Sequence, residues 1–188
     1  MEAAINQYSI YNYHGATMKR IAEEVGIKPA SIYFFYKNKE ALFFAAFQKI
    51  LDDHFQQMKV ILKNAENQPV MDIFSSLIYG SVNYHKQHIN ETNAYISLVN
   101  SPPAEIKPFL HSHMQKFDQW FVDALTGCIK NEISEISDEQ ASTLTKKFII
   151  LMDGIFWEMN LYTEKELEKH INHALDIITV LLKSTALK

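Results

Sequence analysis

Residues 17–42, TMKRIAEEVGIKPASIYFFYKNKEAL, decide the fold of this chain. Apolar side chains recur there with the i, i+3, i+4, i+7 spacing of a short amphipathic helix, at Met18, Ile21, Ala22 and Val25. Gly26 can end that helix because glycine adopts the left-handed conformation without steric cost. Pro29 suits the first turn of a following helix, where its missing N–H would be unpaired anyway. The stretch therefore predicts two helices joined by a tight turn, the helix-turn-helix arrangement that places its second helix in the major groove of DNA.

The second helix of this pair is expected to have a buried side and an exposed side. Ile32, Phe35 and Tyr36 follow the i, i+3, i+4 spacing and are predicted to face the core. Asn38 is a favourable N-cap for the next helix, which is predicted to run to about Lys63. The outward side is then left to Lys28, Ala30, Tyr33 and Phe34.

The segment from Gly26 to Leu42 resembles the DNA-reading segment of the TetR family of transcriptional regulators. Asn12 stands where that family has glycine, and asparagine is the best substitute for glycine in a left-handed turn. Lys28 stands where the family has a Ser or Thr helix cap. A first helix is predicted at residues 1–12, with Ala4, Ile5 and Tyr8 facing inward. The chain begins almost inside this helix, so we expect a basic N-terminal arm to be absent or trimmed. Related residues also occur upstream, at Ala3, Ala4, Tyr8, Tyr13, Thr17, Ile21 and Ala22.

The resemblance, which covers residues 1–48, implies an all-α fold in two parts. Residues 1–48 would form a three-helix helix-turn-helix DNA-binding head, and a long helix would join it to a larger helical body, residues 49–188, that binds an effector and dimerises. Composition agrees, because only five glycines and five prolines occur in 188 residues and few segments alternate like strands. The net charge is −4, but residues 1–48 carry +1 and the remainder −5, which fits DNA contacts confined to one end.

The sequence indicates a cytoplasmic protein with no membrane association. No apolar run reaches membrane-spanning length, and no signal peptide opens the chain. A single cysteine, Cys128, excludes an internal disulfide framework and suits a reducing compartment.

Eight residues around the predicted turn are expected to contact double-stranded operator DNA. Some are expected to bind phosphates. Thr17 caps a helix whose N–H groups can hold an anion, and Lys37 and Lys39 flank the start of the helix that Asn38 caps. Arg20 is ambiguous, because it can pair with Glu23 or Glu24 on its own helix. The full set is Thr17, Lys28, Pro29, Ala30, Tyr33, Phe34, Lys37 and Lys39.

Base contacts are expected from the second helix of the pair. The Lys28 ammonium can reach guanine O6 and N7, while Pro29, Ala30 and Phe34 can touch thymine methyl groups. The resemblance implies that the Tyr33 hydroxyl binds a phosphate.

The middle helices are rich in aromatic and methionine side chains, which suit loose recognition of a hydrophobic ligand. Core packing explains any one of them equally well. The resemblance implies a small effector that releases DNA. The proline-containing loop at residues 101–108 is the candidate entrance, because such loops have few packing constraints. Asp153 and Glu158 can either balance a cationic ligand or lie exposed at the surface. The predicted pocket residues are Phe55, Met58, Leu62, Phe74, Ile78, Tyr95, Phe117, Trp120, Phe121, Phe156 and Trp157.

The last two helices, predicted at about 138–162 and 164–184, are apolar over wide arcs, which favours burial on more than one side. Capping boxes at Ser137 with Gln140 and at Thr163 with Glu166 start them. The resemblance implies a homodimer through these helices, with Ile178 expected in the seam. Burial within a single subunit remains the alternative.

Nothing in the sequence indicates an enzyme, a cofactor or a metal centre. No phosphate-binding glycine loop, HExxH or nucleophile elbow occurs. The pairs His85/His88 and His170/His173 have a spacing that can share a metal, but a surface or dimer-edge position is favoured, since neither pair has obvious further ligands. Cys128 is most simply a small core residue. The sequence therefore predicts an effector-released repressor, with a helical protein–protein adaptor or a metal- or redox-responsive regulator as alternatives.

Overall fold

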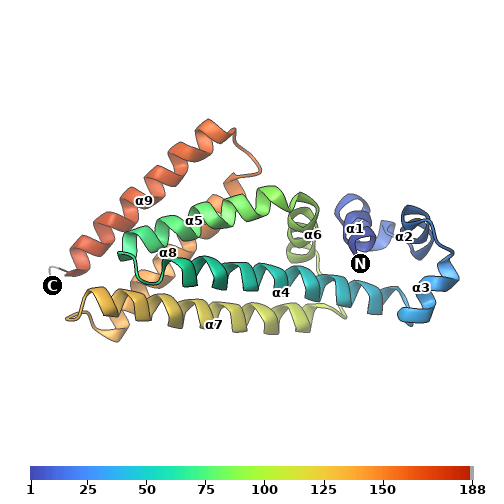
Figure 1. Ribbon diagram of the computed structural model, residues 1–188, viewed down its shortest axis with the longest axis horizontal. Coiled ribbons are helices and arrows are strands. Elements are labelled where there is room, and N and C mark those ends of the chain that lie inside the picture. The colour runs from blue at the N-terminus through green and yellow to red at the C-terminus, as the bar shows by residue number, and fades with distance from the viewer. Residues whose placement is uncertain (187–188) are drawn as a thin grey trace. The chain divides into compact units, whose positions relative to one another are not determined.

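The computed structural model describes residues 1–186, and within them the chain forms helices α1 to α9 and no strands (Figure 1). The all-α prediction is confirmed. The helices are α1 (Glu2–Gly15), α2 (Met18–Val25), α3 (Pro29–Phe35), α4 (Lys39–Ala65), α5 (Val70–Gln87), α6 (Ile89–Asn100), α7 (Lys107–Glu132), α8 (Asp138–Glu158) and α9 (Glu164–Ala186).

The chain divides into two compact units. Unit 1 consists of residues 1–56 and 85–114, and unit 2 of residues 57–84 and the chain from residue 115 onward. The helices α4 and α7 therefore contribute residues to both units. The DNA-binding domain predicted at residues 1–48 lies within unit 1, and its end at residue 48 stays a prediction.

Unit 1 is built on aromatic side chains of α1 and α4. The Tyr8 ring lies 4.7 Å from the Phe47 ring and 5.6 Å from the Phe43 ring, measured between centroids. Ala4, Ile5 and Tyr8 are buried, as predicted for the first helix. The helix α6 packs against α1 and adds Ala94 and Leu98 to the same core. These contacts form the core against which α2 and α3 pack.

The helix α1 is interrupted near its end at Asn12, whose backbone has φ 52° and ψ −171°. The positive φ was predicted from the residue type, but this ψ lies outside the left-handed helical region and belongs to a region that is almost confined to glycine. The Asn12 side-chain oxygen accepts a hydrogen bond from the His14 N–H at 3.1 Å. That local bond offsets part of the strain.

Unit 2 is held by the packing of α8 on α9 and by a stacked pair, Phe74 and Phe148, with centroids 4.2 Å apart. Both predicted capping boxes form: the Gln140 N–H donates to Ser137 Oγ at 3.2 Å, and the Glu166 N–H donates to Thr163 Oγ1 at 3.4 Å. The start of α5 is fixed from α7, since the Val70 N–H donates to a carboxylate oxygen of Glu132 at 2.5 Å. No helix among the described residues is both long and apolar enough to cross a membrane.

Candidate DNA-binding interface

The helix-turn-helix forms as the sequence predicts. Thr17 caps α2, with its Oγ1 accepting a hydrogen bond from the Arg20 N–H at 3.2 Å. Gly26 ends α2 with φ 72° in the left-handed conformation, and the Ile27 N–H closes the turn on the Ala22 carbonyl at 2.9 Å. Because these bonds connect residues three to five apart, the angle between α2 and α3 is set locally.

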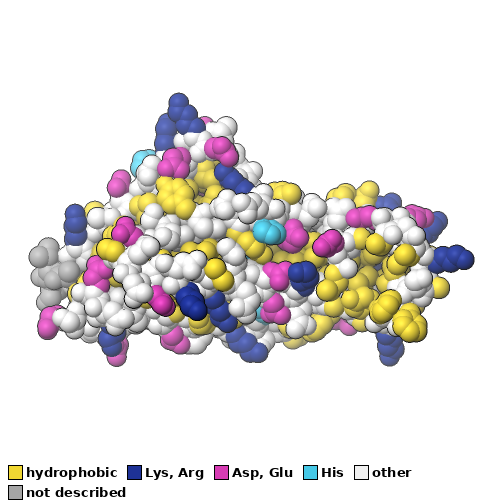
Figure 2. Space-filling view, viewed as in Figure 1, with side chains coloured by type: hydrophobic (Ala, Val, Ile, Leu, Met, Phe, Trp, Pro, Cys, Tyr) yellow, Lys and Arg dark blue, Asp and Glu magenta, His cyan; other side chains and the backbone are white. Residues whose placement is uncertain are grey.

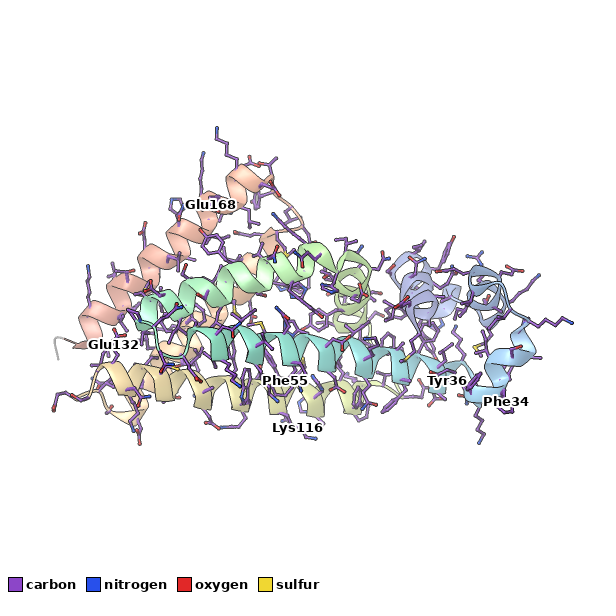
Figure 3. All side chains as sticks on the ribbon, in the orientation of Figure 1. Phe34, Tyr36, Phe55, Lys116, Glu132 and Glu168 are labelled. Carbon is purple, nitrogen blue, oxygen red and sulfur yellow. The ribbon has the colours of Figure 1, made fainter. Side chains whose placement is uncertain are left out.

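Ile32 is the anchor of α3, and three aromatic side chains beside it stand in solvent. Ile32 is 6% exposed, whereas Tyr33 is 52%, Phe34 85% and Phe35 76% exposed. The prediction that Phe35 faces the core is wrong. Phe35 is the last residue of α3, and its side of the helix stays uncovered. Tyr36 follows the helix in an extended conformation and packs against the core of unit 1 (Figure 3).

Val25 is also more exposed than its place in the apolar stripe predicts, at 57%. It is the last residue of α2, next to the turn at Gly26, where no other helix covers it. An open groove of about 830 Å³ lies on this side of unit 1, and its lining includes Val25, Ile5 and Phe35.

Two lysines predicted to hold phosphates differ in their surroundings. Lys37 is exposed between α3 and α4. Lys39 begins α4, and its ammonium lies 4.5 Å from the centre of the Tyr13 ring, an attraction between a cation and the electron-rich ring face. Burial against this ring lowers the pKa of Lys39. Asn38 caps the helix as predicted, with its Oδ1 accepting from the Ala41 N–H at 2.8 Å.

Arg20 does not pair with either glutamate proposed from the sequence. Its guanidinium carbon lies 4.3 Å from the centre of the Tyr11 ring. Glu23 instead contacts Lys19 at 3.8 Å, and Glu24 accepts hydrogen bonds from the side-chain amides of α1. The structure thus adds Arg20 as an exposed cation of α2 that an α1 ring positions, a contact that no spacing within one helix could reveal.

The remaining predicted DNA-contact residues, Thr17, Lys28, Pro29, Ala30 and Tyr33, are all exposed on unit 1. Together with the exposed Lys37 and Phe34, they give unit 1 a surface that combines cations, hydroxyl groups and apolar side chains. Figure 2 shows hydrophobic side chains gathered at the surface around α2 and α3. Such a surface can contact phosphates and base edges together.

The predicted effector-pocket residues fall in both units. Phe55 and Tyr95 belong to unit 1 and the other nine to unit 2. Within unit 2, Trp120 stacks on Phe121 with centroids 5.7 Å apart, while Trp157 is 43% exposed. The buried members of the set are Met58, Leu62, Phe74, Ile78, Phe117 and Phe121.

Two histidines of unit 1 lie together in a way that was not predicted from the sequence: His54 is half-buried and His85 is buried. The His54 and His85 rings stack with centroids 5.1 Å apart, and His85 Nδ1 lies 3.0 Å from Thr92 Oγ1. Burial lowers the pKa of His54 to about 4 and that of His85 to about 3, with further lowering of the first by His113 and of the second by His54. The expectation that His85 lies at the surface is therefore wrong. Only the packing of α4 on α5 brings the two rings together.

Other titratable side chains of unit 2 bear on three ideas from the sequence: a redox-responsive cysteine, a metal site and a cationic ligand. Burial raises the pKa of the Cys128 thiol, which opposes a reactive thiolate. His170 Nδ1 lies 2.6 Å from a Glu158 carboxylate oxygen, so Glu158 already has a partner. Asp153 keeps exposed surface, but burial of its carboxyl and the charge of Asp118 raise its pKa to about 6. No cluster of three or more potential metal ligands occurs among residues 1–186.

Comparisons with known proteins agree with this geometry. Residues 1–46 match the family model for bacterial regulatory proteins of the tetR family. The HTH-type transcriptional regulator RutR of Escherichia coli is 33% identical over 52 residues, which are 28% of this chain and 24% of RutR. The chain thus matches about a quarter of RutR's length. IcaR of Staphylococcus aureus, the negative transcriptional regulator of the biofilm operon icaADBC, is 23% identical over 147 residues, 78% of this chain and 72% of that protein.

Solved structures share the fold over nearly the whole chain. A transcriptional regulator from Pseudomonas aeruginosa PAO1 superposes with a TM-score of 0.73 at 17% identity, covering 99% of this chain and 88% of that one. FadR from Bacillus subtilis, solved in complex with stearoyl-CoA, gives a TM-score of 0.67 at 17% identity and covers 94% of each chain. The first 46 residues are thus similar to the tetR family of bacterial regulatory proteins, and the fold of the whole chain is shared with these solved structures.

Proposed function

We propose that the protein is a DNA-binding transcriptional repressor that a small hydrophobic effector releases from its operator. The single observation that carries the DNA-binding part is the exposed side of α3. Phe34 and Phe35 stand in solvent on a helix that Ile32 anchors and whose entry angle Gly26 fixes. Side chains this apolar are seldom exposed together without a partner.

Cations around this surface support contact with DNA. Lys28 and Lys37 lie at the two ends of α3, and Arg20 lies on α2. Each can neutralise a phosphate, which supplies affinity without sequence preference. The family relatives are transcriptional regulators by name, and we propose accordingly that the protein is not an enzyme and acts in the cytoplasm, where it can reach the chromosome.

The test of this proposal is an enrichment of duplexes from a random pool by the purified protein. A defined motif should emerge from the wild type and should be weakened with Phe34→Ala, which removes the most exposed ring of α3. If the enriched pool stays random, the proposed function is wrong.

We propose a homodimer through α8 and α9. Both helices carry apolar or small residues in solvent, including Ile150, which is 69% exposed, and Val180, which is 66% exposed. On α8 the exposed stripe continues through Gly154 and Trp157, at helical spacing. An open hollow of about 360 Å³ between the two helices includes Ile150, Gly154 and Ile177 in its lining. Pairing two such faces buries surface that one subunit leaves exposed.

The prediction that Ile178 lies in the dimer seam is wrong. Ile178 is fully buried within its own subunit, whereas the neighbouring Ile177 is 48% exposed. Successive helix positions point about 100° apart, so a shift of one residue exchanges core for surface. Two heads joined in such a dimer would meet half-sites about 34 Å apart, or a multiple of that distance.

We propose a hydrophobic effector that acts on the aromatic set of the body. FadR, which shares the fold, was solved with stearoyl-CoA, so the fold can accommodate an acyl chain. In this chain Phe55, Met58 and Leu62 lie on the continuous α4, whose first residues follow α3. A ligand against them would displace α4 and so change the separation of the two heads of the proposed dimer.

A thermal-shift screen of acyl and aromatic compounds tests the effector proposal. An effector should stabilise the free protein and release the enriched duplex. An effector can release DNA only if it binds more tightly to the dimer whose head separation does not fit the operator than to the dimer whose separation does. A hundredfold difference between these two affinities corresponds to about 2.7 kcal/mol. Trp120→Ala should reduce both effects. A tightly bound compound that leaves duplex affinity unchanged would exclude the switch but not DNA binding.

A further inference from the structure

The reading helix has almost no hydrogen-bonding side chains. Between Pro29 and Phe35, only Ser31 and Tyr33 carry a polar group. Guanine is usually read by Arg or Lys and adenine by Asn or Gln, each through two hydrogen bonds to the base edge. None of these four residue types occurs within α3. Lys28, at the N-cap position before α3, is the nearest side chain of this kind along the helix.

Instead, α3 presents aromatic rings to solvent. The Phe34 and Phe35 rings meet edge to face with centroids 5.2 Å apart, so they form one continuous apolar surface. Phe34 is 85% exposed and does not line the groove beside α1 that Phe35 borders. In Figure 3, Phe34 projects from α3 away from the core of unit 1. Phe34 is therefore the more available of the two rings.

Contact with DNA is favourable for such rings only where the DNA is apolar as well. Purine and pyrimidine edges in the major groove offer hydrogen-bond donors and acceptors, which a phenyl ring cannot satisfy. The methyl group of thymine is the apolar exception among the four standard bases. Burying one methyl group is worth about fourfold in affinity, from roughly 0.8 kcal/mol for each buried CH₂-sized group.

We infer that Phe34, with Phe35 beside it, reads thymine methyl groups, so that operator half-sites carry thymine under α3 and methyl contact supplies a main part of their sequence preference. The inference rests on the proposed DNA-binding function and assigns the chemistry of its specificity. The lysines at the ends of α3 then fix the register on the phosphates, and Tyr33 and Ser31 supply the few available hydrogen bonds.

The test replaces thymine by deoxyuridine in a duplex enriched by the wild-type protein. Deoxyuridine pairs like thymine and lacks only the methyl group. Substitution at one thymine at a time should lower affinity about fourfold at two or more positions in each half-site and leave the other positions unchanged. The Phe34→Ala protein should bind the thymine and deoxyuridine duplexes equally at the positions that Phe34 reads, while Phe34→Leu should keep part of the difference.

Val60→Ala serves as a matched control, because Val60 is an apolar side chain that is 51% exposed on the part of α4 that belongs to unit 2. This variant should keep the full wild-type response to deoxyuridine. Equal affinity of the wild type for the thymine and the fully deoxyuridine-substituted duplex, with both preferred over a scrambled one, would overturn methyl reading and leave DNA binding intact. An unchanged deoxyuridine response in Phe34→Ala would overturn the assignment to this ring. Absence of any preferred duplex would remove the proposed function and this inference together.

Discussion

The Lys39 ammonium lies 4.5 Å from the centre of the Tyr13 ring, so a proposed phosphate-binding cation of α4 is held in place by α1. The exposed Lys37, two residues earlier, lies outside the regular helices. The two lysines should therefore behave differently when each is replaced by alanine.

Lys37→Ala and Lys39→Ala should each weaken DNA binding about equally across sequences. Each should also reduce the salt slope of log K by about 0.9, the effect of one lost phosphate contact. Only Lys39→Ala should also lower the free energy of unfolding, by about 0.5–1 kcal/mol, because it removes a cation–π contact. Titration of a labelled duplex at several salt concentrations, together with urea denaturation, measures both quantities. Tyr13→Leu keeps the charge but not the ring face, and unchanged DNA affinity in that variant would contradict a positioning role for Tyr13.

The backbone conformation of Asn12 leads to a predicted order of stability for the wild type and its glycine and alanine variants. Its φ of 52° with ψ of −171° favours glycine, whereas its side chain accepts a hydrogen bond from the His14 N–H. Asn12→Gly should leave stability unchanged or raise it by up to about 1 kcal/mol, and Asn12→Ala should lower it by roughly 1–2 kcal/mol. Urea denaturation of the three proteins gives the order. An alanine variant as stable as the wild type would show that this backbone is not strained.

Local signals in the sequence predicted the starts of α2, α4 and α8 and the end of α2 well, whereas α8 ends at Glu158, short of the predicted residue 162. The caps at Thr17, Gly26, Asn38 and Ser137 rest on hydrogen bonds between residues close in sequence, so residue type and spacing are enough to predict them. Apolar periodicity also predicted the buried side of α1, including Tyr8.

Contacts between helices were not predictable in this way. Arg20 meets Tyr11 and His54 meets His85 only because different helices pack together. Whether a residue of α9 lies in the core or in the proposed seam depends on how α9 is rotated about its own axis. A wide apolar arc does not specify that rotation. Phe35 was misplaced because the apolar spacing within α3 does not show whether another helix covers that side of it.

The buried histidines of unit 1 predict a loss of stability in acid. The folded-state pKa values of His54 and His85, about 4 and about 3, lie below the ordinary value of 6.5. Between pH 6.5 and 4 the unfolded chain therefore binds more protons than the folded one, and stability falls as pH falls. His54 alone would contribute a loss on the order of 3 kcal/mol between pH 7 and pH 4.

Urea denaturation across this pH range provides the measurement. Carboxylates also respond to acid, so the comparison is with a variant carrying His54→Asn and His85→Asn. This variant should be less stable at pH 7 and should lose clearly less stability on acidification. A pH dependence identical to that of the wild type would show that the imidazoles do not govern it.

A substitution at Gly154 tests the proposed position of the dimer seam. A Cβ atom built on Gly154 meets nothing within 4 Å, so the subunit itself has room for a side chain there. Gly127 on α7 is equally open and provides a matched control. Gly154→Arg would place a bulky charge against the partner's α8 and α9 and should yield monomers. Gly127→Arg should leave the dimer intact.

Sedimentation equilibrium at micromolar concentration distinguishes these outcomes, with circular dichroism to confirm that both variants fold. Replacing glycine in a helix interior should if anything raise helix stability, by roughly 0.5–1 kcal/mol. If Gly154→Arg sediments as a dimer like the wild type, the seam lies elsewhere.

The most direct test of DNA reading by α3 is the ratio of two dissociation constants. Fluorescence anisotropy at about 150 mM salt gives the Kd for the enriched duplex and for a scrambled duplex of the same composition. Specific regulators bind their sites at least about a thousandfold more tightly than random DNA, so a ratio of that order is expected for the wild type. With Phe34→Ala and Phe35→Ala combined, the ratio should fall towards one, while binding to the scrambled duplex, which depends on phosphate contacts, stays nearly unchanged. A wild-type ratio close to one would contradict the assignment of this surface as a sequence-reading DNA interface.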